Sequence, residues 1–235
     1  MLDQPTPVHQ RHIATTRRPL FVFHWYGWRR FWRDFAIMQV GFVLVALWFS
    51  LLRQVGVDDL IPWGIVEHGV ADKLSIDVGF AYIIVNIAAV VLALLVRETY
   101  GWGSVAAFVL ITLLWADLME LVVPDLHTDS LAAQLGWVVL AVPIGALGVA
   151  IYMSVNAGAG PRDTLMLWIA RLLHTNVGVA RVVLEVGLIG IGLLLGGSAG
   201  WVTLTHVAVA GPAIWLAFRL LRIEPRNELW GRAMN

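Results

Sequence analysis

The chain has 235 residues, of which 59% are hydrophobic and 14% are charged, and its formal net charge is zero. A soluble domain is usually about 45–50% apolar, so this composition excludes an ordinary soluble protein. The neutral balance gives no bulk attraction to nucleic acid, and the lack of cysteine excludes disulfides, thiol catalysis and Cys-ligated metal sites. We therefore expect a membrane protein whose partner is the lipid bilayer, with no nucleic-acid partner.

The N-terminal region divides into two parts before the first long apolar run. Residues 1–19 are polar and are predicted to form a disordered tail. Residues 20–35, "LFVFHWYGWRRFWRDF", mix aromatic and basic side chains, with Trp25, Trp28 and Trp32 at helical spacing. This pattern predicts an amphipathic helix lying among the lipid headgroups. An ordinary basic flank of the first membrane span is the alternative.

Six apolar runs are long enough to cross a bilayer, which predicts six transmembrane helices. They lie at about 36–55, 78–96, 104–123, 132–153, 177–195 and 201–221. Arginines precede the first run and follow the last, whereas the segments at 56–77 and 124–130 are acidic. The positive-inside rule therefore places both termini, including a tail at 222–235, in the cytoplasm of a bacterial cell. An even number of spans independently requires both termini to lie on one side.

The sequence aligns with itself without a gap when it is shifted by 99 residues. The shift pairs Pro62 with Pro161, the Gly79 region with the Gly178 region, and Gly101-Trp102 with Gly200-Trp201. Matching proline, glycine and tryptophan at one offset is more specific than matching leucines. The pattern predicts two three-span repeats, at 36–123 and 131–221.

Each predicted repeat contains three spans, so the second repeat enters the membrane the opposite way up. Each also contains a short helix that begins at a proline, at about 62–74 and 161–173, and is too short to span. We therefore predict an all-α membrane protein of six transmembrane helices in two inverted three-helix repeats, each with a half-helix. This arrangement is typical of secondary transporters, in which paired short helices mark the binding site.

Two motifs also resemble a known family. The "GAGPRDTLM" of Gly158–Met166, the "PWGIVEHG" of Pro62–Gly69 and the two-fold repeat resemble the YczE/YitT-like bacterial inner-membrane proteins, over about residues 36–221. The first-half motif departs from the family pattern, with Gly64 after Pro-Trp and a changed order around Glu67-His68. The resemblance implies a polytopic membrane protein, for which a transporter role is one expectation, and it implies no particular substrate.

The start of the second half-helix is the first candidate site. Pro161 suits the first helical position, and Gly160 before it allows close approach of the backbone. Arg162 and Asp163 follow, where a helix N-terminus binds an anionic group or, through the carboxylate, a coupling cation. The alternative is that Asp163 only caps its own helix.

Two further pairs of polar residues lie within predicted spans. Arg181 and Glu185 are four apart and share a helix face, and Asn86 is the repeat equivalent of Glu185. A structural ion pair is the alternative for the first two. Asp117 and His206 lie at comparable depth, where they relay protons or simply pack as polar groups. We place Arg162, Asp163, Arg181 and Glu185 in an inner group. The outer group is Asn86, Asp117 and His206.

No metal-ligand spacing, P-loop or hydrolase motif is present in the sequence, so no catalytic residue, metal or cofactor is predicted. The leading hypothesis is a secondary transporter that moves a small solute or ion by alternating access. A non-transporting accessory subunit and a membrane enzyme acting on a lipid-linked substrate are the alternatives. The oligomeric state is open, and a homodimer is one option.

Overall fold

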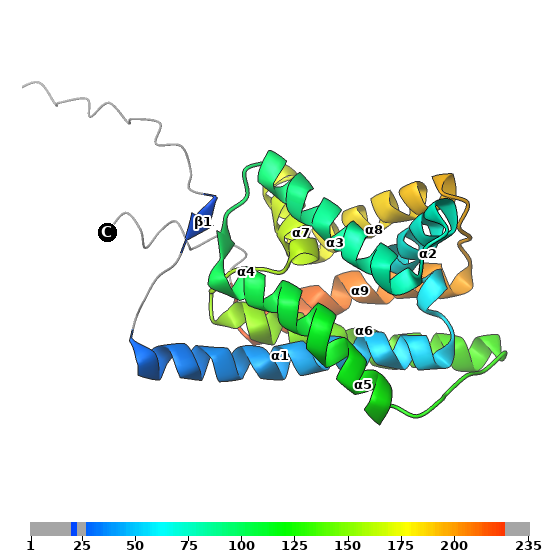
Figure 1. Cartoon of the computed structure of the whole chain (residues 1–235), viewed down its shortest axis with the longest axis horizontal. Helices are drawn as coiled ribbons and strands as arrows, with labels where there is room; N and C mark the ends of the chain where they lie inside the picture. The colour runs from blue at the N-terminus through cyan, green and yellow to red at the C-terminus, as the bar shows by residue number, and fades with distance from the viewer. Residues whose placement is uncertain (1–19, 23–26, 224–235) are drawn as a thin grey trace, which may run out of the picture.

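The computed structural model describes residues 20–22 and 27–223 (Figure 1). The predictions for 1–19, for Trp25 and for 224–235 therefore lie outside the described residues. Six helical segments of the described part are long and apolar enough to cross a membrane. They are α1 (Trp28–Val55), α3 (Val78–Leu95), the segment Trp102–Val122, α6 (Leu131–Ser154), α8 (Val177–Leu194) and α9 (Trp201–Leu220). The prediction of a six-span helical membrane protein is confirmed at this level.

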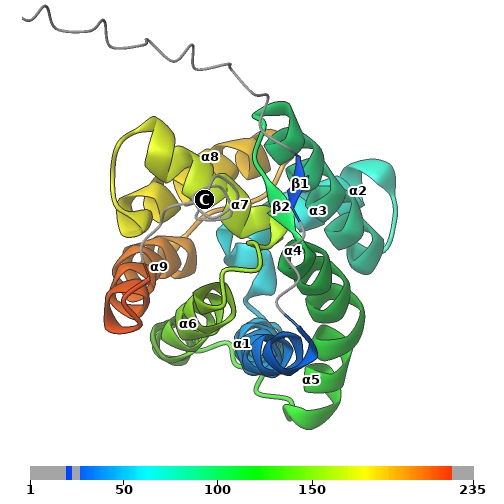
Figure 2. The ribbon, with the colours of Figure 1, turned by 90° about the vertical axis from the view of Figure 1, so that its left-hand side faces the viewer.

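The six segments alternate in direction along the chain, with the start of α1 and the end of α9 at the same end of the molecule (Figure 1). Helix α1 packs against α6, α6 packs against α9, and α8 packs against α9. Seen end-on, α1 lies beside both α6 and α5 (Figure 2). The first described turn of α1 and the last turn of α9 therefore lie on one side of the molecule.

The start of the first helix differs from the prediction of a separate element at 20–35. Helix α1 begins at Trp28, after Gly27 with a φ of 91°, and continues without a break through residue 35. No proline interrupts this stretch, and Arg30 pairs with Asp34 one turn later at 3.6 Å. Upstream, strand β1 (Phe21–Val22) pairs in parallel with β2 (Tyr100–Gly101). An interfacial location for the first turns of α1 stays a prediction.

The third spanning segment is not a uniform α-helix. It consists of α4 (Trp102–Ala106), a π-helix labelled η2 (Ala107–Trp115) and α5 (Ala116–Val122). The wider turns of a π-helix are frequently found at functional sites. Here they place Ile111 and Thr112 beside the central cavity described below.

The two short helices are α2 (Pro62–Leu74), which follows a 3₁₀ turn η1 (Asp58–Leu60), and α7 (Pro161–Leu172). Each begins with its proline, whose missing N–H would have no partner in the first turn. Helix α2 packs against α3 and α8, and α7 packs against α8 and α3. Both half-helices are therefore surrounded by spanning helices.

Element bounds in the two halves of the chain correspond at the 99-residue shift. Helices α3 and α8 begin and end at matching positions, α2 and α7 begin at matching prolines, and α1 and α6 end at matching residues. The third spans begin at the matching residues Trp102 and Trp201. The two halves share local signals, namely a proline at the start of each short helix and Gly-Trp before each third span. These signals therefore give the same element bounds in both halves.

Helices α1 and α6 approach closely through glycine. A Cβ atom at Gly148 would lie 2.7 Å from the carbonyl oxygen of Gly41 and 2.9 Å from Leu44 Cβ. A Cβ atom at Gly41 would lie 2.6 Å from the carbonyl oxygen of Gly148. Small residues at such contacts allow two membrane helices to approach at backbone distance.

We predict that Gly148→Ala destabilises the protein. The added methyl meets backbone atoms, which cannot move aside as a flexible side chain can, so the cost is about 1–3 kcal/mol. Gly136→Ala, on the same helix with nothing within 4 Å of its Cβ position, is the control and should be neutral or slightly stabilising. Thermal unfolding in one detergent measures both, and equal melting temperatures for the two variants would contradict the close contact.

Candidate functional site

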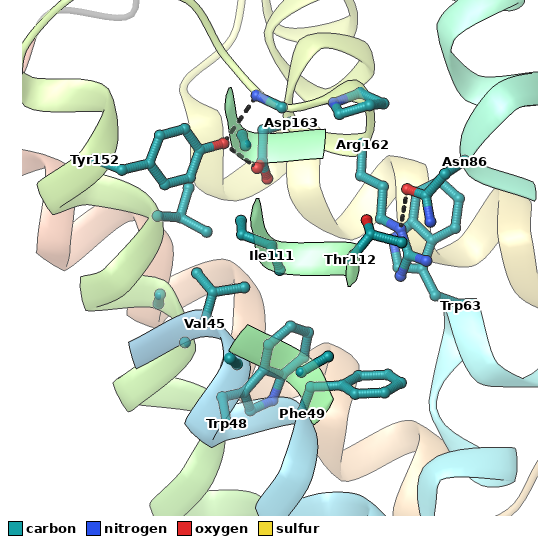
Figure 3. Close-up of a pocket in the computed structure, with 18 of the residues that line it drawn as sticks. Val45, Trp48, Phe49, Trp63, Asn86, Ile111, Thr112, Tyr152, Arg162 and Asp163 are labelled. Carbon is teal, nitrogen blue, oxygen red and sulfur yellow. Dashed lines mark hydrogen bonds between the residues drawn. The ribbon is translucent and has the colours of Figure 1, made fainter. Parts of the chain in front are cut away.

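A cavity lies at the centre of the molecule, among α1, η2, α6 and the first turn of α7 (Figure 3). Its volume is about 90 Å³. Aromatic side chains form much of its wall, and polar groups gather on the side nearest α7. The polar and charged residues that line it include Asn86, Tyr152, Arg162, Asp163, Arg181 and His206. A mostly apolar cavity with a few convergent polar groups is typical of a small-molecule site.

Arg162 projects from the first turn of α7 into this cavity (Figure 3). Its Nε donates to Asn86 Oδ1 at 3.1 Å, and its Nη2 donates to the carboxylate of Glu67 on α2. The guanidinium carbon lies 4.6 Å from the centroid of the Trp63 ring and 4.5 Å from that of the Tyr82 ring. A cation placed over two aromatic faces is attracted to both. Every one of these partners belongs to the first half of the chain.

Asp163 makes a different set of contacts. The hydroxyl of Tyr152, on α6, donates to its carboxylate, while the backbone N–H of Gly160 donates to the Tyr152 oxygen at 3.0 Å (Figure 3). Arg181 Nη1 lies 3.7 Å from Asp163 Oδ1. The alternative that Asp163 only caps its own helix does not describe this geometry, because its hydrogen bond comes from a tyrosine on another helix.

Arg181, Glu185 and His206 continue the polar cluster between α8 and α9. Arg181 Nε donates to Glu185 Oε1 at 2.6 Å, and His206 Nδ1 lies 3.3 Å from Glu185 Oε2. All three side chains are buried, and Glu185 is 0% exposed. Buried charges of this kind are costly unless they are paired, so the carboxylate is held by two partners.

The polar cluster contains more carboxylates than guanidiniums. Its three carboxylates, from Glu67, Asp163 and Glu185, face two guanidiniums, from Arg162 and Arg181. With a neutral His206, the cluster therefore has one negative charge without a permanent counter-charge.

Seven of the eight predicted site residues meet in this cluster or at its edge, and Asp117 does not. The residues brought together are Asn86, Gly160, Arg162, Asp163, Arg181, Glu185 and His206. The expected split into an inner and an outer group is wrong for two of them, since Asn86 bonds to Arg162 and His206 pairs with Glu185. His206, on α9, therefore pairs with Glu185 of α8 and does not pair with Asp117, because α9 packs against α8.

Sequence reasoning gave too little weight to three contributors. Glu67 was not among the predicted site residues, yet it is 2% exposed and pairs with Arg162. Tyr152 and Tyr82 were not singled out, although each contacts a charged group of the site. The repeat held a usable signal, because Tyr82 is the equivalent of Arg181 and Trp63 is the equivalent of Arg162.

A second hollow opens beside the cavity, between α3 and the η2–α5 segment. Its volume is about 300 Å³, and Phe49, Tyr82, Thr112 and Ala116 line both hollows. We call it the α3–α5 cleft. Its charged lining comprises Arg53, Asp58, Glu67, Asp77, Asp117 and Glu120, with His68 beside them. Asp117 is exposed here, and burial raises the pKa of the Asp58 carboxyl above its ordinary value.

Comparison with known proteins places the chain in a family. Residues 30–218 match the family of unknown function DUF6198. The chain belongs to this family. It is 22% identical over 198 residues to an uncharacterized protein of Haemophilus influenzae, covering 84% of this chain and 89% of the relative. It is also 26% identical over 176 residues to the uncharacterized membrane protein YczE of Bacillus subtilis, covering 73% and 79%.

The match to YczE confirms the resemblance to YczE-like membrane proteins. No solved structure matches the chain. Together with the six apolar helices, the relatives identify an integral, multi-pass membrane protein.

We predict that the pair between Arg162 and Glu67 is strongly coupled. Removing one partner leaves a buried charge uncompensated, so Arg162→Gln and Glu67→Gln should each destabilise by about 3–5 kcal/mol. The double variant should lose much less than the sum, because neither charge remains. Thermal or denaturant unfolding of the three variants gives the coupling energy. Losses that simply add would show that the two side chains do not interact.

Proposed function

We propose that this protein is a secondary transporter in the bacterial inner membrane, which moves a small solute by alternating access between two inverted three-span repeats. The opposite directions of α1 and α6 support the inverted relation (Figure 1). The matched element bounds support it further. Transporters of this kind bind solute at the centre, where broken or short helices meet. Here the first turns of α2 and α7 meet at the contact between Trp63 and Arg162.

The observation that carries the proposal is a helix contact that is closed in one half of the chain and open in the other. In the second half, α8 and α9 touch at glycine. A Cβ atom at Gly211 would lie 2.6 Å from Val182 Cγ2, and one at Gly178 would lie 2.6 Å from the Gly211 carbonyl oxygen and 2.9 Å from Trp215 Cβ. No solute can pass through this contact.

The equivalent positions in the first half are Gly79, Ile83, Thr112 and Ala116. All four line the α3–α5 cleft. A Cβ atom at Gly79 would meet only its neighbouring residue Asp77 within 4 Å. The surfaces of α3 and α5 that correspond to the touching surfaces of α8 and α9 are therefore separated by an open cleft.

Exchange of these two arrangements would open the central cavity on the opposite side. If α3 closes on α5 as α8 closes on α9, and α8 separates from α9, the cavity loses one access route and gains the other. Alternating access requires this exchange around a fixed site. Arg162, Asp163, Arg181 and His206 line that site, while Glu67 and Glu185 hold the arginines from behind.

We predict that the two helix pairs open and close reciprocally. Spin labels at Ile84 and Leu121 report α3–α5, and labels at the equivalent Val183 and Leu220 report α8–α9, since all four side chains are exposed. The chain lacks cysteine, so cysteines introduced at these positions are the only ones that the spin labels can modify. Gly211→Ala, whose methyl would meet Val182, should lengthen the α8–α9 distance and shorten the α3–α5 distance in nanodiscs.

Gly187→Ala is the control, because nothing lies within 4 Å of its Cβ position on α8. It should leave both distance distributions as they are in the original protein. An accessory subunit requires no exchange, so single, unchanged distances in both pairs with Gly211→Ala would contradict the transporter proposal. Comparing metabolites in cells that express the original protein or Arg162→Gln then identifies the solute.

We also predict that both termini are cytoplasmic, because the arginines flanking the first and last spans follow the positive-inside rule. A reporter fused at Asn235 and active only in the cytoplasm should show activity. The same reporter inserted near His127, between α5 and α6, should not, and the opposite result would reverse the orientation.

A further inference from the structure

We propose that the His206–Glu185 pair is a proton-binding site at the wall of the central cavity, and that its proton is the coupling ion of the transporter. This inference rests on the proposed function and names the ion that drives it. Three observations on the described residues carry it. They are the hydrogen-bonding pattern of His206, the charge of the groups around it, and its place on the cavity wall.

The hydrogen-bonding pattern fixes which nitrogen of His206 is available. Glu185 receives a bond from Arg181 at 2.6 Å, which favours its ionised, acceptor-only form. His206 Nδ1, 3.3 Å from the other oxygen of Glu185, must therefore carry the hydrogen. In the neutral ring, Nε2 is left with a lone pair. In the described part of the chain, Nε2 is buried and has no hydrogen-bond partner.

His206 also lines the central cavity, although only 1% of its surface is exposed to solvent. Its ring lies beside Trp48 of α1, with ring centroids 6.0 Å apart. A buried polar atom without a partner costs free energy unless something binds it. A proton arriving through the cavity converts Nε2 from an unused acceptor into an N–H donor.

Charged groups surround His206 on several helices. Glu185 and Arg181 face it from α8, Asp163 lies beyond Arg181 on α7, and Tyr152 holds Asp163 from α6. Together with Glu67 and Arg162, these groups have a formal net charge of −1 when the three carboxylates are ionised and His206 is neutral. One proton on Nε2 makes this formal charge zero.

The exchange of access routes acts directly on this pair. His206 lies on α9 and Glu185 on α8, so separation of α8 from α9 moves the two side chains apart. A protonated ring attracts the Glu185 carboxylate more strongly than a neutral ring does. The protonated pair therefore favours the closed α8–α9 contact and the open α3–α5 cleft, and proton binding shifts the equilibrium between the two access states.

The first experiment follows the protonation of His206 directly. The full-length protein, labelled with ¹⁵N-histidine and placed in nanodiscs, is titrated between about pH 5 and pH 9. His206→Asn serves to assign the signal among the seven histidines, because an asparagine amide can still donate to Glu185 but takes no proton. We expect a ring with hydrogen only on Nδ1 at high pH and on both nitrogens at low pH. A ring that keeps one form throughout would overturn the proposal.

The second experiment asks whether that proton moves the helices. With spin labels at Ile84 and Leu121, lowering the pH should lengthen the α3–α5 distance in the original protein. His206→Asn should abolish the shift. His68→Gln, which removes a histidine that lines the cleft, is the matched control and should retain it.

The outcomes separate this inference from the proposed function. If Gly211→Ala exchanges the two arrangements but His206→Asn keeps the full pH response, transport stands and the proton site is wrong. If His206 titrates while the distances ignore pH, the proton is not the coupling ion, and the proposal falls as well. A pH response that is lost in His206→Asn and kept in His68→Gln supports it.

Discussion

The burial of Arg162 is the constraint on which the rest of the site depends. A guanidinium deep in a membrane protein persists only if anionic and polar partners surround it. Those partners, Glu67 and Asn86 with the rings of Trp63 and Tyr82, all come from the other half of the chain. The second half-helix therefore reaches its position only against a folded first half, and the two halves share one centre.

Close helix contacts make that shared centre possible. In a bilayer, the lipid tails are as apolar as leucine, so helices associate through fitted surfaces more than through the hydrophobic effect. Gly41 and Gly148 bring α1 to α6, while Gly178 and Gly211 bring α8 to α9. The first contact is a fixed frame in this interpretation, and the second is a contact that can separate, since the equivalent surfaces in the first half are already apart.

The sequence predicted the bounds of the helices better than it predicted the contacts between them. Helix starts at Pro62, Pro161 and Trp201 follow from local signals, so the expected bounds agree closely with the structure. Which side chains pair depends on packing between segments far apart in the chain. Nothing local in the sequence indicates that Glu67 on α2 pairs with Arg162. His206 was matched to Asp117 because the two lie at similar depth, and depth alone does not show that α9 packs against α8.

The two halves are similar in backbone but complementary in side-chain size at the moving contact. Where the second half has Gly211 and Trp215, the first half has Thr112 and Ala116. Beside α8, Gly211 allows close approach and Trp215 fills the remaining space. Beside α3, Thr112 occupies part of the space and Ala116 leaves the rest open. The closed forms of the two contacts therefore cannot be identical in packing. In the proposed transporter, a small difference in their stability lets one bound proton or solute decide which contact is open, since a shift between states needs only a differential interaction with them.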